Sequence, residues 1–182
     1  MLHNTRECSE AMVNAFIAVG SNIEPRRHIP DALDKLQGQA RVTGVSTFYR
    51  TEPLGGRAQP AFLNGVWRLE TAISPRALKF DVLRTIESEL GRVRTTDKYA
   101  ARTIDLDLIL YGERIVDEPD LILPDPDMRV RSFIAVPLLE IAPDLVIPGT
   151  GERLAFIVAS LSTRRLEPDR NFTRGLQSRV SS

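Results

Sequence analysis

Two aspartates, Asp105 and Asp107, stand at the start of the most strand-like segment of the chain, TIDLDLILY (residues 103–111). Side chains alternate between the two faces of a strand, so both aspartates lie on one face, about 7 Å apart at ~3.3 Å per residue. Burying two parallel carboxylates without a partner is costly. A cation relieves their repulsion, and Mg²⁺ is commonly held by one or two carboxylates together with substrate phosphates. A solvated strand end or an Asp–Arg ion pair is the alternative interpretation.

Arginines stand close to this strand in the sequence. Arg92 and Arg94 follow the preceding helix, Arg102 comes just before the strand, and Arg129 and Arg131 lie downstream. Guanidinium groups bind phosphate oxygens through planar, bidentate hydrogen bonds. Carboxylates and arginines together therefore suit a polyphosphate with its metal ions. The sequence has neither GxxxxGK[ST] nor GxGxxG, which argues against a P-loop, a protein-kinase glycine loop and a Rossmann site.

A second candidate site lies in FYRTEPLGGRAQPAFLN (residues 48–64). Its prolines and glycines predict a loop whose ends bring Leu54, Phe62 and Asn64 together. An asparagine carboxamide presents donors and an acceptor in one plane, which suits the edge of a heterocycle, and aromatic rings stack on its faces. The alternative is ordinary hairpin packing, with Asn64 at a strand bulge.

The surrounding segments predict a sheet covered by helices. Apolar patterns and turn signals predict strands at 14–19, 42–48, 62–71 and 103–111, and helices after Asn22, with Pro30 in the first turn, and from Ser74 to Gly91. The order strand, helix, strand, strand, helix, strand is the split βαβ pattern of ferredoxin-like folds. Short helical pieces are expected at 133–139 and 153–161, and an aperiodic loop at 92–102. In the last strand, Ile104, Leu106, Leu108 and Leu110 should share one core face.

Composition limits the classes of function. The 182 residues are 42% hydrophobic with a net charge of zero, which fits one globular domain and lacks the basic excess of nucleic-acid binders. The sequence shows no membrane helix and no signal-peptide core, so we expect a cytoplasmic monomer without membrane or nucleic-acid partners. One cysteine and two histidines form no recognisable metal cluster, so a metal must be held by oxygen. We expect an N-terminal extension (1–13), one domain (14–161) and a polar, loosely held tail (162–182).

From Asn14 to Leu145 the chain resembles the 6-hydroxymethyl-7,8-dihydropterin pyrophosphokinase family of folate biosynthesis. The similar segments are FIAVGSN (16–22), STFYRTEPLG (46–55), QPAFLN (59–64), LGRVR (90–94), RTIDLDLILYG (102–112) and RSFIAVPLLEIAPDL (131–145). The resemblance implies an α+β fold, an α/β/α sandwich with a ferredoxin-like βαββαβ core and an antiparallel sheet. It also implies transfer of pyrophosphate from ATP to a pterin hydroxymethyl group, with release of AMP.

The resemblance assigns roles by matched position. Asp105 and Asp107 would bind two Mg²⁺ ions on the ATP phosphates, with Asp107 near the attacking hydroxyl. The nucleotide side would comprise Glu87, Arg92, Arg102, Asp125 and Arg131, of which Arg92 and Arg102 would act in catalysis with the two aspartates. The pterin side would comprise Thr51, Pro53, Leu54, Phe62, Asn64, Tyr99 and Phe133, with Asn64 at the ring edge.

Three segments depart from the family's usual pattern. YAAR (residues 99–102) replaces Trp-Gly-Pro-Arg, Asp125 replaces a histidine, and Pro30 interrupts the first helix. An ionised aspartate repels phosphate, so we expect Asp125 either to pair with Arg129 or Arg131 or to turn toward solvent. These departures bear on efficiency and on the choice of substrate.

Three other functions are compatible with parts of the pattern. A divergent paralogue would act on a different pterin-like alcohol, and a non-catalytic protein would bind a pterin or nucleotide without turnover. Retention of Asp105 and Asp107 argues against the second. An RNA-binding ferredoxin-like module is the least favoured, because the chain has no basic excess and no strand with paired aromatic residues.

Overall fold

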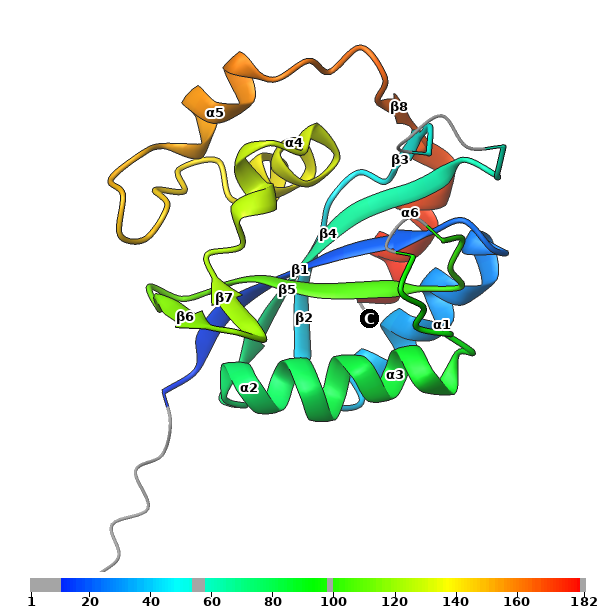
Figure 1. Cartoon of the computed structure of the whole chain (residues 1–182), viewed down its shortest axis with the longest axis horizontal. Coiled ribbons are helices and arrows are strands. Elements are labelled where there is room, and N and C mark those ends of the chain that lie inside the picture. The colour runs from blue at the N-terminus through cyan, green and yellow to red at the C-terminus, as the bar shows by residue number, and fades with distance from the viewer. Residues whose placement is uncertain (1–10, 54–57, 98–99, 181–182) are drawn as a thin grey trace, which may run out of the picture.

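The structure is a computed structural model that describes residues 11–53, 58–97 and 100–180. Its centre is an antiparallel sheet in the order β5-β1-β4-β3-β8, in which β2 also pairs with β4 (Figure 1). The strands of this sheet are β1 (Val13–Ser21), β2 (Arg41–Val45), β3 (Tyr49–Thr51), β4 (Phe62–Thr71), β5 (Asp105–Tyr111) and β8 (Glu167–Pro168). A separate hairpin is formed by β6 (Val116–Glu118) and β7 (Leu121–Leu123).

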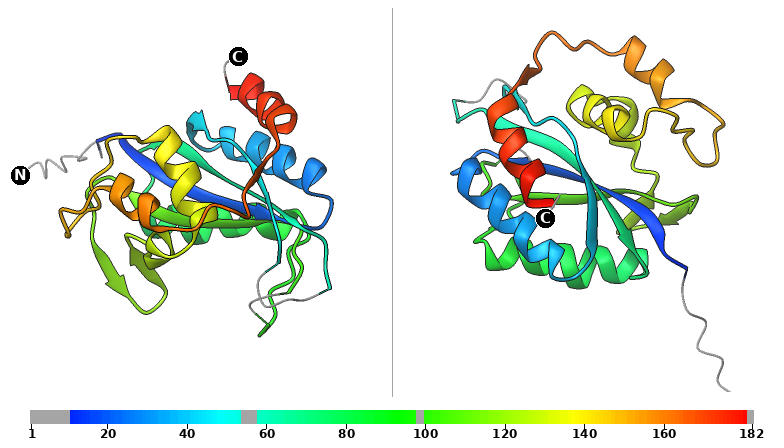
Figure 2. Two further views of the ribbon diagram at one scale, coloured as in Figure 1. Left: turned by 90° about the horizontal axis from the view of Figure 1, so that it is seen from above. Right: turned by 180° about the vertical axis from the view of Figure 1, so that it is seen from behind.

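Helices cover both faces of the sheet, which confirms the α+β sandwich. They are α1 (Pro25–Gln37), the continuous run of α2 (Pro75–Ala77), η1 (Leu78–Leu83) and α3 (Arg84–Glu89), the 3₁₀ turn η2 (Pro126–Arg129), α4 (Ser132–Ile141), α5 (Leu154–Ser160) and α6 (Arg170–Val180). The figures show α1, α3 and α6 on one face and α4 and α5 on the other (Figures 1 and 2). Each face has its own apolar core. Within the part of the chain that is described, no helix has the length and apolarity to cross a membrane.

The helix boundaries follow local signals, with one exception. Ser74 caps the second helical run by accepting a hydrogen bond from the Ala77 amide, with Pro75 at the first helical position. Gly91 follows the run with φ +78°, a conformation that glycine adopts readily. The placement of Pro30 in the first turn of α1 was wrong, because Pro25 begins this helix and Pro30 lies inside it.

The alternation of β5 breaks before the strand ends. Leu108 pairs with Ile17 and Leu110 with Phe16, so β5 has one extra residue, Ile109, at this point. Such a bulge shifts the later side chains to the opposite face. Leu110 therefore lies in the core beneath α4, whereas Leu108 lies in the core on the α1 side. The expectation that Leu110 shares the face of Leu108 was wrong, but the two aspartates precede the bulge and stay on one face.

The C-terminal residues pack on the domain, so the expectation of a loosely held tail was wrong. The short strand β8 extends the sheet beyond β3, and α6 packs on the face that α1 also covers. Leu176 is 1% exposed in the core, and Phe172 and Val180 pack against it at helical spacing. This apolar stripe holds an otherwise polar segment on the domain. The domain boundaries at residues 13 and 161 stay a prediction.

Candidate active site

One row of residues across the sheet brings the two expected sites together. Gly20 on β1 pairs with Asn64 on β4 and with Asp105 on β5, and Tyr49 on β3 pairs with Asn64. Directly opposed residues of antiparallel strands point to the same face. Asn64 and Asp105 therefore lie on one face with only Gly20 between them. A Cβ atom at Gly20 would be 2.7 Å from Asn64 Oδ1, so the glycine gives the carboxamide its space.

A cavity of about 380 Å³ lies over this row, between the sheet and the start of α4. Its volume is in the range of small-molecule sites. Of the residues expected from the sequence, the lining includes Thr51, Phe62, Asn64, Arg102, Asp105, Asp107, Arg131 and Phe133. Residues from Gly20 on β1 to Ile134 on α4, far apart in the chain, thus meet at one cavity.

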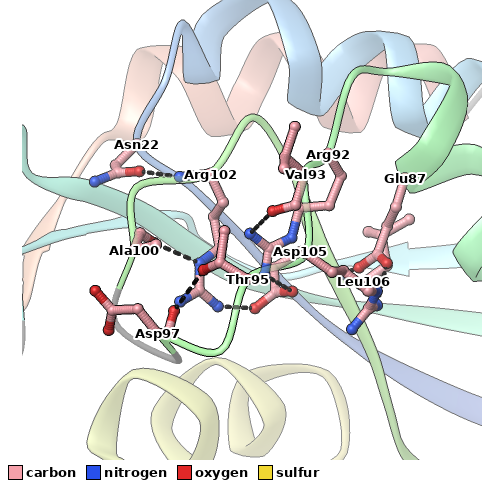
Figure 3. Close-up of polar contacts among 11 residues, drawn as sticks. Asn22, Glu87, Arg92, Val93, Thr95, Asp97, Ala100, Arg102, Asp105 and Leu106 are labelled. Atoms are coloured by element: carbon pink, nitrogen blue, oxygen red, sulfur yellow. Dashed lines mark hydrogen bonds and ion pairs between the residues drawn. The ribbon is translucent and has the colours of Figure 1, made fainter.

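Two arginines neutralise Asp105 in this structure. Arg102 forms a close ion pair with one carboxylate oxygen, and Arg92 Nη2 lies 3.4 Å from the other (Figure 3). The side chains of Arg92, Arg102 and Asp105 are only 11–19% exposed, so the three charges are well shielded from water. The ion pair considered from the sequence is therefore present, and the arginines sit where phosphate groups could replace the carboxylate as their partner.

Asp107 has a different environment. Its side chain opens into the cavity, yet surrounding protein desolvates the carboxyl group. This desolvation, followed by repulsion from Asp105, Glu87 and Asp125, raises the pKa of Asp107 to about 7. A cation would relieve this excess of negative charge.

Glu87 supports β5 from beneath. It is 1% exposed, its Oε1 accepts a hydrogen bond from the Leu106 amide at 2.8 Å, and its other oxygen pairs with Arg94. Burial raises the pKa of Glu87 above its ordinary value. Because β5 is an edge strand, the Leu106 amide needs such an acceptor. Glu87 therefore fixes the backbone between the two aspartates and ties it to the start of the loop at 92–102.

Asn22 joins the two loops that border the cavity, and sequence reasoning did not single it out. Its Oδ1 accepts a hydrogen bond from the Arg102 amide at 2.8 Å (Figure 3). Its Nδ2 donates to Gln59 Oε1 and to the Pro60 carbonyl. The Asn22 amide also donates to the Arg102 carbonyl. Asn22 therefore sets the position of Arg102 relative to the segment that leads into β4.

Comparison with known proteins decides the family. A sequence model described as 7,8-dihydro-6-hydroxymethylpterin-pyrophosphokinase (HPPK) matches residues 16–143. The chain belongs to the HPPK family. A 2-amino-4-hydroxy-6-hydroxymethyldihydropteridine pyrophosphokinase of Pseudomonas aeruginosa is 41% identical over 84% of this chain and 94% of that protein. The enzyme of the same name from Haemophilus influenzae is 43% identical over 76% of this chain and 88% of its own length.

Longer proteins contain a similar region. The folic acid synthesis protein fol1 of Pneumocystis carinii is 39% identical over 84% of this chain, which spans only 21% of fol1. A crystal structure of a triple mutant of Plasmodium falciparum HPPK-DHPS with pteroate superposes with a TM-score of 0.64 at 10% identity, over 84% of this chain and 44% of that one. At this identity the likeness shows a shared fold.

Several expected residues of this HPPK-family chain lie apart from the cavity. Of those that the structure describes, Pro53, Glu87, Arg92 and Asp125 are not part of the lining. Leu54 and Tyr99 lie outside the described residues. Conversely, Glu52, Gln59 and Asp127 line the cavity without having been singled out from the sequence.

Asp125 caps a turn and does not form the ion pair with an arginine that was one of its two expected environments. Its Oδ1 accepts a hydrogen bond from the Asp127 amide at 2.8 Å and so caps the 3₁₀ turn η2. Arg129 pairs instead with Glu152, and Arg131 Nε lies 3.7 Å from Asp127. Of the two alternatives expected for Asp125, pairing with Arg129 or Arg131 was therefore wrong, and the side chain is half-buried and not turned fully toward solvent. Burial raises the pKa of Asp125, which remains near enough to Asp107 to raise the pKa of that residue too.

Proposed function

We propose that this chain transfers pyrophosphate from ATP to the hydroxymethyl group of 6-hydroxymethyl-7,8-dihydropterin, with AMP as the second product, and that the cavity over Gly20 holds both substrates. Membership of the HPPK family gives the reaction class. The observation that supports the placement is the row across the sheet, because it sets the Asn64 carboxamide and the Asp105 carboxylate side by side on one face.

The pterin occupies the Asn64 end of the cavity. Asn64 Nδ2 donates to Thr51 Oγ1 at 2.7 Å, which fixes the carboxamide and leaves its Oδ1 to accept from a ring N–H. Phe62 on β4 and Phe133 on α4 supply aromatic surfaces from the sheet and from the helix above it. A flat bicyclic ring fits such a site through edge hydrogen bonds and face stacking.

The phosphates of ATP occupy the opposite end, beside Arg92, Arg102 and Arg131. Arg102 and Arg131 line the cavity, and Arg92 reaches Asp105 from below. Arg92 Nε is buried without a hydrogen-bond partner among the described residues, and a buried donor of this kind calls for an acceptor. Because Arg92 does not line the cavity, a phosphate oxygen would provide it only when the guanidinium leaves its pair with Asp105. On binding, the arginines exchange the Asp105 carboxylate for phosphate.

Asp105 and Asp107 are suited to hold two Mg²⁺ ions that enter with the nucleotide. Carboxylate oxygens are the ligands that Mg²⁺ prefers, and Asp107 is desolvated and lies near three further carboxyl groups, both of which raise its pKa. No group of three or more His, Cys, Asp or Glu side chains that could hold a metal occurs among the described residues, so phosphates and water must complete the coordination. Bound metal would neutralise the phosphate charge and the developing charge on AMP.

The chain's own groups position the reaction more than they take part in covalent chemistry. The pterin hydroxyl oxygen forms a bond to the β-phosphorus, in line with the bond between this phosphorus and the α,β-bridging oxygen. That bond breaks, the bridging oxygen leaves with AMP, and the hydroxyl proton is released to solvent. Asp107 accepts a hydrogen bond from the attacking hydroxyl and orients it. Arg92, Arg102 and Arg131 stabilise the charge on the transferred group, since phosphoryl-transfer catalysis is mainly positioning and electrostatics.

Products distinguish this function from its alternatives. We expect incubation with Mg-ATP and 6-hydroxymethyl-7,8-dihydropterin to yield AMP and the pterin diphosphate in equal amounts. Formation of ADP would contradict pyrophosphoryl transfer. Binding of both ligands without any product would instead support the non-catalytic alternative.

Gly20→Ala tests the pterin end of the cavity. We expect this variant to bind the pterin at least about tenfold more weakly, because the new Cβ would displace Asn64 Oδ1, now 2.7 Å from that position, and disrupt its hydrogen bond to the ring. Calorimetric titration with the pterin measures the effect. Gly175→Ala is the control, since a Cβ there meets no atom within 4 Å. Unchanged affinity in Gly20→Ala would contradict the placement.

A further inference from the structure

The chain between β2 and β3 lacks regular pairing with β4. Val45 pairs with Trp67 and Tyr49 pairs with Asn64, so three residues on one side face two on the other. This count defines a bulge, which leaves backbone groups without ladder partners. The three residues are Ser46, Thr47 and Phe48. The Ser46 amide still donates to the Val66 carbonyl of β4 at 3.0 Å, whereas the amides of Thr47 and Phe48 donate to side chains outside the sheet.

The C-terminal segment supplies hydrogen-bond partners for the backbone amide and carbonyl of Phe48 in the bulge. Thr173 Oγ1 on α6 accepts a hydrogen bond from the Phe48 amide at 2.8 Å, and the Asp169 amide donates to the Phe48 carbonyl at 2.8 Å. Thr173 is 5% exposed, and its hydroxyl donates in turn to the Asp169 carbonyl. Strand β8 continues this contact by pairing Pro168 with Tyr49. Both backbone groups of Phe48 therefore depend on residues 169–173.

The Phe48 side chain transmits this contact to β4. Its ring lies edge-on to Phe172 with centroids 5.7 Å apart, and on its other side it fills the space above Gly65, where a Cβ would come within 2.6 Å of the ring. Gly65 is the neighbour of Asn64. The ring of Phe48 is thus clamped between α6 and the strand that carries Asn64.

The bulge sets which residues of β3 face the cavity. With the register observed, Tyr49 and Thr51 lie on the same face as Asn64, and Thr51 Oγ1 accepts the Asn64 hydrogen bond. A slip of one residue would turn Thr51 to the opposite face. The bond between Thr51 and Asn64 therefore depends on the position of the bulge, which α6 holds at Phe48 and Glu140 on α4 holds at its two neighbours.

We propose that Thr173 is a positioning residue for the pterin end of the cavity: through Phe48 it fixes the register of β3 against β4, and so the Thr51–Asn64 pair. The inference rests on the proposed assignment of Asn64 to the pterin. It gives the C-terminal segment, which lies beyond the region matched by the family model, a role in substrate affinity. Arg102 and the two aspartates are held by Asn22 and Glu87 instead, so the nucleotide end is independent of Thr173.

Thr173→Val tests this role, because it removes the hydroxyl and keeps the branched shape. We expect the dissociation constant of the pterin to rise about three- to tenfold, the equivalent of one net hydrogen bond. The affinity for a non-hydrolysable Mg-ATP analogue should be unchanged, and Thr173→Ser should restore pterin binding. Calorimetry of both ligands, below the melting temperature of each variant, gives the comparison.

Thr71→Val is the matched control. Thr71 is 3% exposed, and its hydroxyl likewise accepts a backbone amide, that of Ile73, but at the far end of β4. The Thr71→Val variant should be less stable than the wild type and should bind the pterin with unchanged affinity. Equal weakening of both ligands in Thr173→Val, or unchanged pterin binding, would overturn the inference. If Asn64→Ala also retained full pterin affinity, the assignment of the pterin end would fail as well.

A measurement on the unaltered protein avoids dependence on variant folding. Amide hydrogen exchange at Phe48 should slow on addition of the pterin and stay constant on addition of the Mg-ATP analogue, because only the pterin end is coupled to the bulge. Equal slowing by both ligands, or by neither, contradicts the proposed coupling.

Discussion

Replacement of Asp107 by asparagine is expected to lower kcat at least about a hundredfold, a barrier increase of ~2.7 kcal/mol. The same change should raise the melting temperature of the metal-free protein. Activity falls because the amide cannot supply the negative charge that holds a cation. Stability rises because the ionised carboxylate of the free protein is desolvated and repelled by Asp105, Glu87 and Asp125. Such opposed effects are typical of groups kept for function.

The stability gain should depend on pH in a defined direction. The pKa of Asp107 is raised to about 7, above its value in the unfolded chain, so the folded protein binds the proton more tightly. The favourable contribution of Asp107 to the free energy of unfolding of the wild type is therefore present at low pH and is lost as pH rises through about 7. The advantage of Asp107→Asn should grow from pH 4 to pH 8. Melting curves across that range measure it, with Asp117→Asn as the control, because Asp117 is exposed as Asp107 is but lies on the separate β6–β7 hairpin.

A variant at either aspartate that keeps more than a tenth of the wild-type rate would contradict the metal assignment, since that corresponds to less than ~1.4 kcal/mol. Asp105→Ala should lose turnover as Asp107→Asn does. Its effect on stability should differ, because Asp105 is paired with Arg92 and Arg102, and its removal takes the carboxylate charge from two shielded guanidinium groups.

The second large effect is expected at Arg102, where one substitution should lower turnover and strengthen the binding of a cation. Arg102→Ala should lower kcat/KM at least about a hundredfold, because arginines that stabilise a transferred phosphoryl group are worth 10³ or more in several enzymes. In the absence of nucleotide, the same variant should bind Mn²⁺ several-fold more tightly. Arg102 occupies the Asp105 carboxylate in the free structure and competes with a cation for it.

Binding of Mn²⁺ alone, followed by calorimetry or by its paramagnetic signal, separates these effects. Arg102→Lys keeps the positive charge but loses the planar fork, so it should leave Mn²⁺ affinity near wild type while turnover still falls. Unchanged or weaker Mn²⁺ binding in Arg102→Ala would mean that the pair with Asp105 does not restrain cation entry.

Local sequence patterns predicted the elements that carry the site. The alternation around Asp105 and Asp107 placed both on one face, and the loop pattern brought Phe62 and Asn64 together with Leu54, which lies outside the described residues. Strand partners could not be read from one strand alone, so the bulge at Ile109, and with it the reversal of Leu110, was missed. Bulges of this kind depend on which residue of the neighbouring strand comes opposite.

Two other features had sequence signals that were not used. Phe172, Leu176 and Val180 have the spacing of a helical apolar stripe, but the polar composition around them favoured a loose tail. Asp125 followed by Pro126 is the pattern of a helix cap and first helical position, which explains its role better than an arginine partner does. By contrast, the bonds of Asn22 to two distant loops leave no local signal.

The central claim is that one cavity binds the pterin at Asn64 and the nucleotide at the two aspartates. The most direct test is calorimetric titration of Asn64→Ala and Asp105→Ala, each with the pterin and with a non-hydrolysable Mg-ATP analogue. We predict a crossed result: Asn64→Ala loses at least about tenfold in pterin affinity and keeps its affinity for the analogue, while Asp105→Ala does the reverse. Loss of both affinities in both variants, or of neither, would contradict the two-ended site.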